Sequence, residues 1–184
     1  MSRGVISNAE SGLSVRNKLN SNFYEKFVET ITIAEYAGDV LTRSDNPTVL
    51  RLTNGNLIMG FQGFSGSVAD TGLATLYTCL STDDGVTWST PVKQFESLGT
   101  TGTYNPSFYQ RLDGSVFAIL LVQQSPATSD LWKVESSDGG LTFGGTQSII
   151  WEGGSSYAAP APNRIYRTMS GRLLYPFNIA MTAD

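Results

Sequence analysis

Histidine is absent from this 184-residue sequence, and cysteine occurs once, as Cys79. The first absence excludes Ser-His-Asp triads, histidine-ligated metals and acid–base chemistry by an imidazole. The second excludes a disulfide within the chain, and it leaves too few soft ligands for a transition-metal site. We therefore predict no metal and no cofactor. Any catalysis has to use carboxylates, tyrosines or arginines.

Charge is also scarce, with 15% charged residues, a net charge of −4 and no basic run. Binding to nucleic acid through phosphate neutralisation is therefore not expected. No stretch approaches the roughly 20 apolar residues that span a bilayer, so we expect no membrane insertion. The chain does not open with a basic segment followed by an apolar one, and we predict no secretory signal.

What the sequence does contain is an eight-residue template, Ser-x-Asp-x-Gly-x-Thr-aromatic, at Ser81–Trp88 and again 55 residues later at Ser136–Phe143. An Asp in such a turn accepts hydrogen bonds from N–H groups about two residues on, and Gly supplies a positive φ. The aromatic residue then returns to the apolar layer. The template predicts two structural turns, with key positions Ser81, Asp83, Gly85, Trp88, Ser136, Asp138, Gly140 and Phe143.

The repeat extends upstream of each turn. Asn46-Pro47 and Asn105-Pro106 each precede a short strand, and a Gly follows each Pro by 8 positions, at Gly55 and Gly114. Asn-Gly and Asp-Gly at these places favour tight hairpins. A third copy begins near Pro162, so that the prolines at 47, 106 and 162 are separated by 59 and 56 residues. Three aligned copies predict stacked or radially arranged units.

Each unit is predicted to contain four strands. The expected buried strands are Leu57–Phe61 and Val116–Val122, the third strands are Ala74–Leu80 and Leu131–Ser136, and long loops lie at Gln62–Gly72 and Gln123–Asp130. Four strands in a repeat of roughly 40–50 residues are typical of a β-propeller blade. A β-solenoid is the rival architecture, but its rungs are usually shorter.

The predicted fold is therefore mainly β, a partial propeller over residues 41–184 with two blades and the start of a third. Such a propeller is incomplete, because two blades and a hairpin cannot close a ring. Residues 1–40 form a separate segment, in which Val15, Leu19, Phe23 and Phe27 recur at i, i+4 spacing. This pattern predicts one amphipathic helix over about Ser14–Thr30. The helix either lies against its own propeller or anchors the chain to something larger.

Residues Ala9–Phe23, which include Val-Arg-Asn-Lys-Leu-Asn-Ser-Asn-Phe after a Gly-containing turn, resemble a segment near the N-termini of bacteriophage tail and fibre proteins. The resemblance implies a virion location, a homotrimer, and contact with other virion proteins through residues 1–40. We prefer this interpretation to the intramolecular helix.

Residues 46–184 resemble the sialidase superfamily, whose six-bladed propellers carry Asp-box turns like Ser81–Trp88 and Ser136–Phe143. In that family the boxes are structural turns. The resemblance implies a site with three carboxylate-binding arginines, an Asp acid–base, and a Tyr nucleophile paired with a Glu. Asp70 lies where the family's acid–base Asp is found. Asp45 occupies the place of the first arginine, Arg43 is out of register, and the other groups belong to later blades.

The leading hypothesis is a virion structural protein, a tail or head fibre or appendage, that displays a sialidase-like propeller for binding host surface glycans. The alternative is the N-terminal part of an exo-acting sialidase-type glycoside hydrolase, and a third is a glycan-binding propeller of non-viral origin. We lean against enzymatic activity for this chain. Aromatic residues that offer faces to sugars, or belong to the core, are Tyr104, Tyr109, Trp132 and Tyr157.

Overall fold

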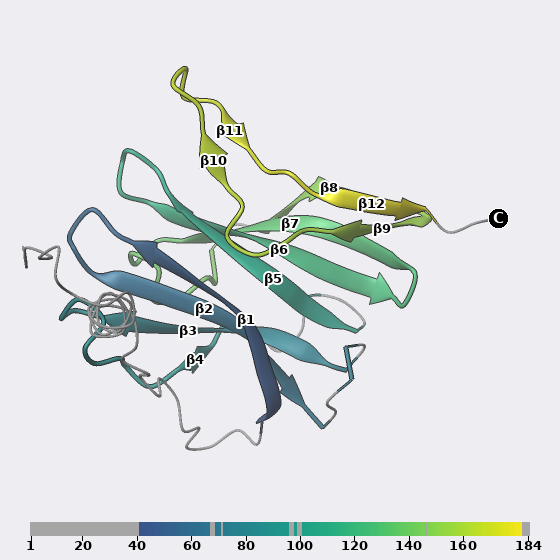
Figure 1. Ribbon diagram of the computed structural model, residues 1–184, viewed down its shortest axis with the longest axis horizontal. Coiled ribbons are helices and arrows are strands. Elements are labelled where there is room, and N and C mark those ends of the chain that lie inside the picture. The colour runs from purple at the N-terminus through teal and green to yellow at the C-terminus, as the bar shows by residue number, and fades with distance from the viewer. Residues whose placement is uncertain are drawn as a thin grey trace, which may run out of the picture. The chain divides into compact units, whose positions relative to one another are not determined.

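A computed structural model of the protein describes residues 41–66, 69–70, 72–95, 98, 101–145 and 147–181. Over this part of the chain the regular structure consists of β-strands, with no helix (Figure 1), so the predicted mainly β class is confirmed. It follows that none of the described elements is a helix able to cross a membrane. Residues 1–40, and with them the predicted helix of Val15, Leu19, Phe23 and Phe27, lie outside the described residues.

Two four-stranded repeats form one continuous sheet. The first repeat contains β1 (Leu41–Arg51), β2 (Leu57–Ser65), β3 (Ala74–Ser81) and β4 (Val92–Lys93). The second contains β5 (Gly102–Gln110), β6 (Val116–Ser125), β7 (Thr128–Ser136) and β8 (Gln147–Trp151). Within each repeat, neighbouring strands pair antiparallel in chain order. A single parallel pair, Ala74 with Gly102, joins β3 to β5 and so links the two repeats.

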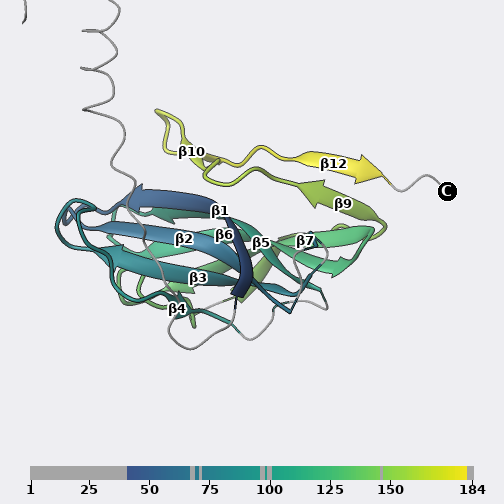
Figure 2. The ribbon, with the colours of Figure 1, turned by 60° about the horizontal axis from the view of Figure 1, so that its bottom comes forward.

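A third hairpin follows, and Figure 2 shows it as a separate layer beside the sheet. It consists of β9 (Ser156–Ala159), β10 (Tyr166–Arg167), β11 (Leu173–Leu174) and β12 (Asn178–Met181), with β9 paired to β12 and β10 to β11. Its turn bond from Thr168 N to Arg172 O corresponds to the bond from Leu52 N to Asn56 O. The third hairpin is therefore the counterpart of β1–β2 and β5–β6, and the described sheets do not close into a ring.

The first part of each unit contains an asparagine with a left-handed backbone, which lies in β1, in β5, and between β9 and β10. Asn46, Asn105 and Asn163 have φ values of 50°, 53° and 56°. Asparagine tolerates this region better than most residues, because its short polar side chain bonds locally. The feature that the three units share is therefore the left-handed asparagine, and not the position of the proline. Asn46 and Asn105 precede a proline, whereas Asn163 follows Pro162, so the third copy differs by one residue at this position.

The two template turns carry the same hydrogen bonds. Ser81 Oγ donates to Asp83 Oδ1 at 2.9 Å and accepts from Gly85 N at 2.9 Å, while Asp83 accepts from Thr87 N at 2.8 Å and Thr87 Oγ1 at 2.6 Å. The second turn repeats each bond with Ser136, Asp138, Gly140 and Thr142. The carboxylate thus reaches four residues on, not two, because two consecutive residues in each turn have positive φ. Phe143 is fully buried, whereas Trp88 is half-buried.

The predicted long loop at Gln123–Asp130 is wrong. Strand β6 continues to Ser125 and β7 begins at Thr128, so two residues make the turn. Ser125 Oγ accepts hydrogen bonds from the N–H groups of Ala127 and Thr128 at 3.2 and 3.1 Å. Polar Gln and Ser residues suggested a loop, but the side chain of Ser125 supplies the acceptor that a tight turn needs. In the first repeat β2 also runs on, to Ser65.

The core forms where successive units pack face to face. Ile58 and Leu76 of the first repeat meet Phe108, Val116 and Leu120 of the second in one buried cluster. On its other face the second repeat contributes Phe117 and Leu131, against which Ile165, Tyr175 and Phe177 of the third hairpin pack. Cys79 is buried in the first repeat, and burial raises its pKa to about 12, which keeps the thiol protonated and unreactive.

Gln94 joins the first repeat to the second turn. Its Nε2 donates to Thr78 Oγ1 at 2.6 Å and to Leu141 O at 3.1 Å, and its Oε1 accepts from Phe143 N at 2.9 Å. One amide side chain therefore satisfies groups from both repeats. An amide is suited to this position because it donates and accepts at once.

We predict that Gln94→Glu destabilises the fold by about 1–3 kcal/mol, because the carboxylate cannot donate to Leu141 O and places a negative charge against that carbonyl oxygen, which keeps only the longer bond from Thr78 Oγ1. Urea unfolding measures the change. Gln147→Glu, at an exposed residue of β8, introduces the same charge and is expected to have little effect. Equal losses in the two variants would show that Gln94 does not link the repeats.

Candidate functional site

The two ends of the sheet differ in chemistry. The template turns follow β3 and β7, at the end where β1 turns into β2, and Arg51 reaches from that hairpin to an ion pair with Asp84. The opposite end holds the start of β1, the end of β2 and the segment before β3, and Asp70 lies there. Because functional side chains commonly sit on connections carried by rigid strands, this second end is the place to look for a site.

Arg43 and Asp70 meet at this end. Arg43 Nη1 lies 2.8 Å from Asp70 Oδ1, and Arg43 Nη2 lies 2.9 Å from Asp45 Oδ2. Arg43 and Asp45 are two residues apart on β1, so their side chains leave the same side of the strand. The guanidinium also covers the ring of Phe64, with its central carbon 4.0 Å from the ring centroid. The Asp70 side chain is 92% exposed, so a ligand can reach it from solvent.

Two tyrosines from other units border this ion-pair cluster. Tyr104 of β5 donates its hydroxyl to Gly72 O at 2.7 Å, and burial raises its pKa to about 12. Tyr157 of β9 is half-buried; burial raises the pKa of its phenol, and the Asp70 carboxylate raises it further. Asp70 therefore lies within electrostatic reach of Tyr157, and the first repeat, the second repeat and the third hairpin all contribute to this end.

The structure thus places Asp70 beside Arg43, which the sequence analysis had set aside as out of register. The shift of pairing between Leu41 and Arg43 on β1 brings the arginine opposite Phe64. A one-residue irregularity of this kind leaves no sequence signal. Of the other aromatic candidates, Tyr109 packs on Phe117 with ring centroids 5.5 Å apart, and Trp132 packs against the first core cluster. The catalytic role of Asp70 stays a prediction.

Chemically, the cluster offers two carboxylates and one guanidinium near the half-buried ring of Tyr157, while Phe64 is fully buried under Arg43. Carboxylates accept hydrogen bonds from hydroxyl groups, and guanidinium groups donate them, which together suit a polyhydroxylated ligand. Across the described ranges, no three His, Cys, Asp or Glu side chains are placed to hold a metal ion.

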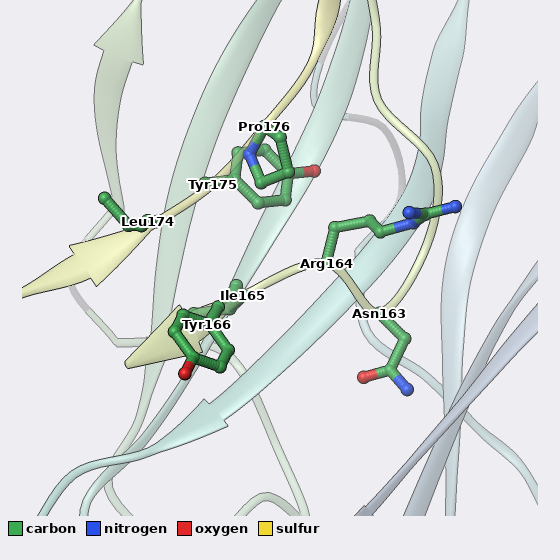
Figure 3. Close-up of a pocket in the computed structure, with 7 residues that line it drawn as sticks. All are labelled: Asn163, Arg164, Ile165, Tyr166, Leu174, Tyr175 and Pro176. Atoms are coloured by element: carbon green, nitrogen blue, oxygen red, sulfur yellow. The ribbon is translucent and has the colours of Figure 1, made fainter. Parts of the chain in front are cut away.

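A pocket of about 680 Å³ lies instead on the third hairpin, lined by Asn163, Arg164, Ile165, Tyr166, Leu174, Tyr175 and Pro176. Figure 3 shows the side chain of Arg164 running away from the Tyr166 ring. By strand register, Leu174 corresponds to Phe117 and Ile58 of the first two units. Those two residues are 4% and 0% exposed, whereas Leu174 is 43% exposed. The pocket therefore occupies a face that the repeat covers elsewhere, and it is not organised around converging polar groups.

Comparison with known proteins gives the fold and little else. No family model matches the chain, and no curated protein does. The chain is similar to a crystal structure of a protein of unknown function from Dyadobacter fermentans, with a TM-score of 0.59 and 19% sequence identity. The aligned region covers 80% of this chain and 46% of the other protein. The Hadza microbial sialidase Hz136 is a more distant structural neighbour, with a TM-score of 0.47, 15% identity, and coverage of 66% and 27%. The chain thus spans less than half the length of both.

We predict that Asp70→Asn lowers the pKa of Tyr157, because it removes a negative charge that disfavours the phenolate. The pKa stays above its usual value, since burial, the larger cause, remains. Ultraviolet titration with and without Tyr157→Phe isolates this one tyrosine. Asp84→Asn, at the opposite end, should leave the titration unchanged. If the pKa of Tyr157 is the same in Asp70→Asn as in the wild type, the charge of Asp70 does not act on Tyr157.

Proposed function

We propose that the chain is the glycan-binding part of a bacteriophage virion appendage, built as a sialidase-like β-propeller and joined to the particle by residues 1–40. The observation that carries the glycan-binding proposal is the Arg43–Asp70 ion pair, which covers Phe64 and lies near Tyr157 at the open end of the strands. Sugar-binding sites combine such charged hydrogen-bonding groups with aromatic surface, which the half-buried ring of Tyr157 would supply here, since Phe64 is fully buried.

The propeller interpretation is supported by the way that the three units pack. Each contains an asparagine with a left-handed backbone in its first part, and each presents a face to the next unit. Two repeats and one hairpin would then be two blades and the start of a third. In such an arrangement the ends of the inner strands converge, and residues from successive units line one site. Tyr104 and Tyr157, from two successive units beside Asp70, fit this arrangement.

We expect the protein to bind surface glycans, and Asp70→Ala to weaken binding about tenfold or more, since hydrogen bonds to charged groups contribute roughly 1.5–3 kcal/mol. A glycan array followed by calorimetry on the bound sugars measures the effect. Asp84→Ala removes an exposed, ion-paired carboxylate at the other end, with a side chain 75% exposed, and should bind as the wild type does. Failure to bind any glycan would reject the proposal.

A sialidase-type glycoside hydrolase is the second candidate, and the exposure of Asp70 favours it, because a general acid must reach the leaving oxygen of the substrate. The same protein samples distinguish the two functions. Release of the fluorophore from a sialoside by the wild type, and its loss in Asp70→Asn, would establish hydrolysis. Absence of turnover at every pH, with retained binding, leaves the binding function.

The virion part of the proposal rests on the sequence of residues 9–23. We predict that Leu19→Asp together with Phe23→Asp removes the protein from purified particles, because both changes place charge on the apolar face of the expected helix. Lys18→Gln, on another face, should leave incorporation intact. Immunoblotting of particles and sedimentation of the isolated protein, expected to be trimeric, test this. A monomer absent from wild-type particles would contradict the anchoring role.

A further inference from the structure

We infer that Asp45 and Asp70 make the Arg43 site selective for uncharged sugars, so that glycans ending in a carboxylate, sialic acids included, bind poorly. This inference rests on the proposed glycan binding and names the ligand class of that same site. It runs against the expectation from the sialidase resemblance, in which arginines bind the carboxylate of an acidic sugar.

The first step concerns the donors of Arg43. Both terminal nitrogens of its guanidinium already face carboxylate oxygens, one from Asp45 at 2.9 Å and one from Asp70 at 2.8 Å. Recognition of a sugar carboxylate by arginine uses these same two N–H edges in a forked geometry. An acidic sugar therefore has to displace Asp70 and still lie beside Asp45.

The second step concerns charge. One guanidinium against two carboxylates leaves the cluster with one excess negative charge. The charge of Asp70 also acts on Tyr157, whose pKa is raised first by burial and then by this carboxylate. Like charges brought together in a partly buried site repel, and such repulsion discriminates strongly between ligands.

The third step identifies what the cluster accepts. Asp45 Oδ1 is buried and has no hydrogen-bond partner among the described residues, so it is an acceptor that lacks a donor. The side chain of Asp70 is 92% exposed, and Asp70 Oδ1 faces Arg43. Hydroxyl groups donate to such carboxylate oxygens, whereas a ligand carboxylate has no proton to donate. Hydroxyl groups of a neutral sugar are therefore the donors that suit the exposed Asp70 carboxylate, while the buried Asp45 Oδ1 adds an acceptor that repels a ligand carboxylate.

The experiment compares matched glycan pairs that differ by one terminal acidic sugar, such as neutral galactosides and the same galactosides capped with sialic acid. The wild type is expected to bind the neutral member about tenfold tighter or more, a difference of about 1.4 kcal/mol. In Asp70→Asn, one Arg43 nitrogen loses its charged partner. Affinity for the acidic member should then rise about tenfold, while affinity for the neutral member changes less than about threefold.

Asp84→Asn makes the same change in net charge at the opposite end of the sheet and should leave the preference unchanged, which separates a local effect from a global one. If no glycan binds, the proposed function fails. If glycans bind but the wild type prefers the acidic member, or if Asp70→Asn leaves the preference unaltered, glycan binding stands and the inference is overturned.

Discussion

The arrangement of the molecule depends on a line of hydrogen bonds at the left-handed asparagines of the first two units. Asn46 Nδ2 donates to Asn105 Oδ1 at 2.6 Å, and Asn105 Nδ2 donates to Pro160 O at 2.9 Å, so one unit is tied to the next and that one to the third hairpin. Asn105 N is bound in turn by the buried side chain of Gln62, at 2.9 Å. These bonds require the left-handed backbone of both asparagines, because an extended residue would carry its side chain away from the neighbouring strand. The bend at Asn46 falls within the pairing shift between Asp45 and Thr48, and Arg43, on the stretch of β1 before it, lies over Phe64 and pairs with Asp70.

The two ends of the sheet use the same type of side chain, aspartate, in different ways. At the turn end, the carboxylate oxygens of Asp83 and Asp138 accept hydrogen bonds within their own turns, which lowers the pKa of both groups. These oxygens therefore have little remaining capacity to bind a ligand. At the other end, Asp70 has the same type of side chain but pairs with Arg43, a residue of strand β1. A carboxylate held by its own turn stabilises that turn. A carboxylate whose partner comes from a strand distant in the sequence, as Arg43 does for Asp70, does not hold its own turn together. Such a carboxylate can therefore bind a ligand in place of that partner.

Local patterns in the sequence predicted local structure well. The template turns, the Gly hairpins and the starts of the buried strands at Leu57 and Val116 follow from turn chemistry and apolar runs, which depend on a few neighbouring residues. What depended on register or on contacts between units was not predictable. Arg43 meets Asp70 only because β1 shifts its pairing, and Gln94 joins two repeats from a position with no motif. Asp70 was named as a candidate from the sequence, but its partner Arg43 was set aside, because counting residues along one strand does not reveal a shift in its pairing with the next strand.

The position of Arg43 also bears on the choice between binding and catalysis. A carboxyl group that protonates a leaving oxygen has to face the substrate, whereas one that pairs with a guanidinium directs an oxygen toward that cation. Asp70 forms such a pair, and Asp45 holds the other side of the same guanidinium, which fixes its plane over Phe64. The arginine is thus engaged as a structural counter-ion for two carboxylates. An arginine engaged in this way orients the oxygen acceptors around it and is not free to bind an anion. The exposed carboxylate of this cluster therefore presents hydrogen-bond acceptors to solvent, which suits the hydroxyl-bearing ligand proposed for it.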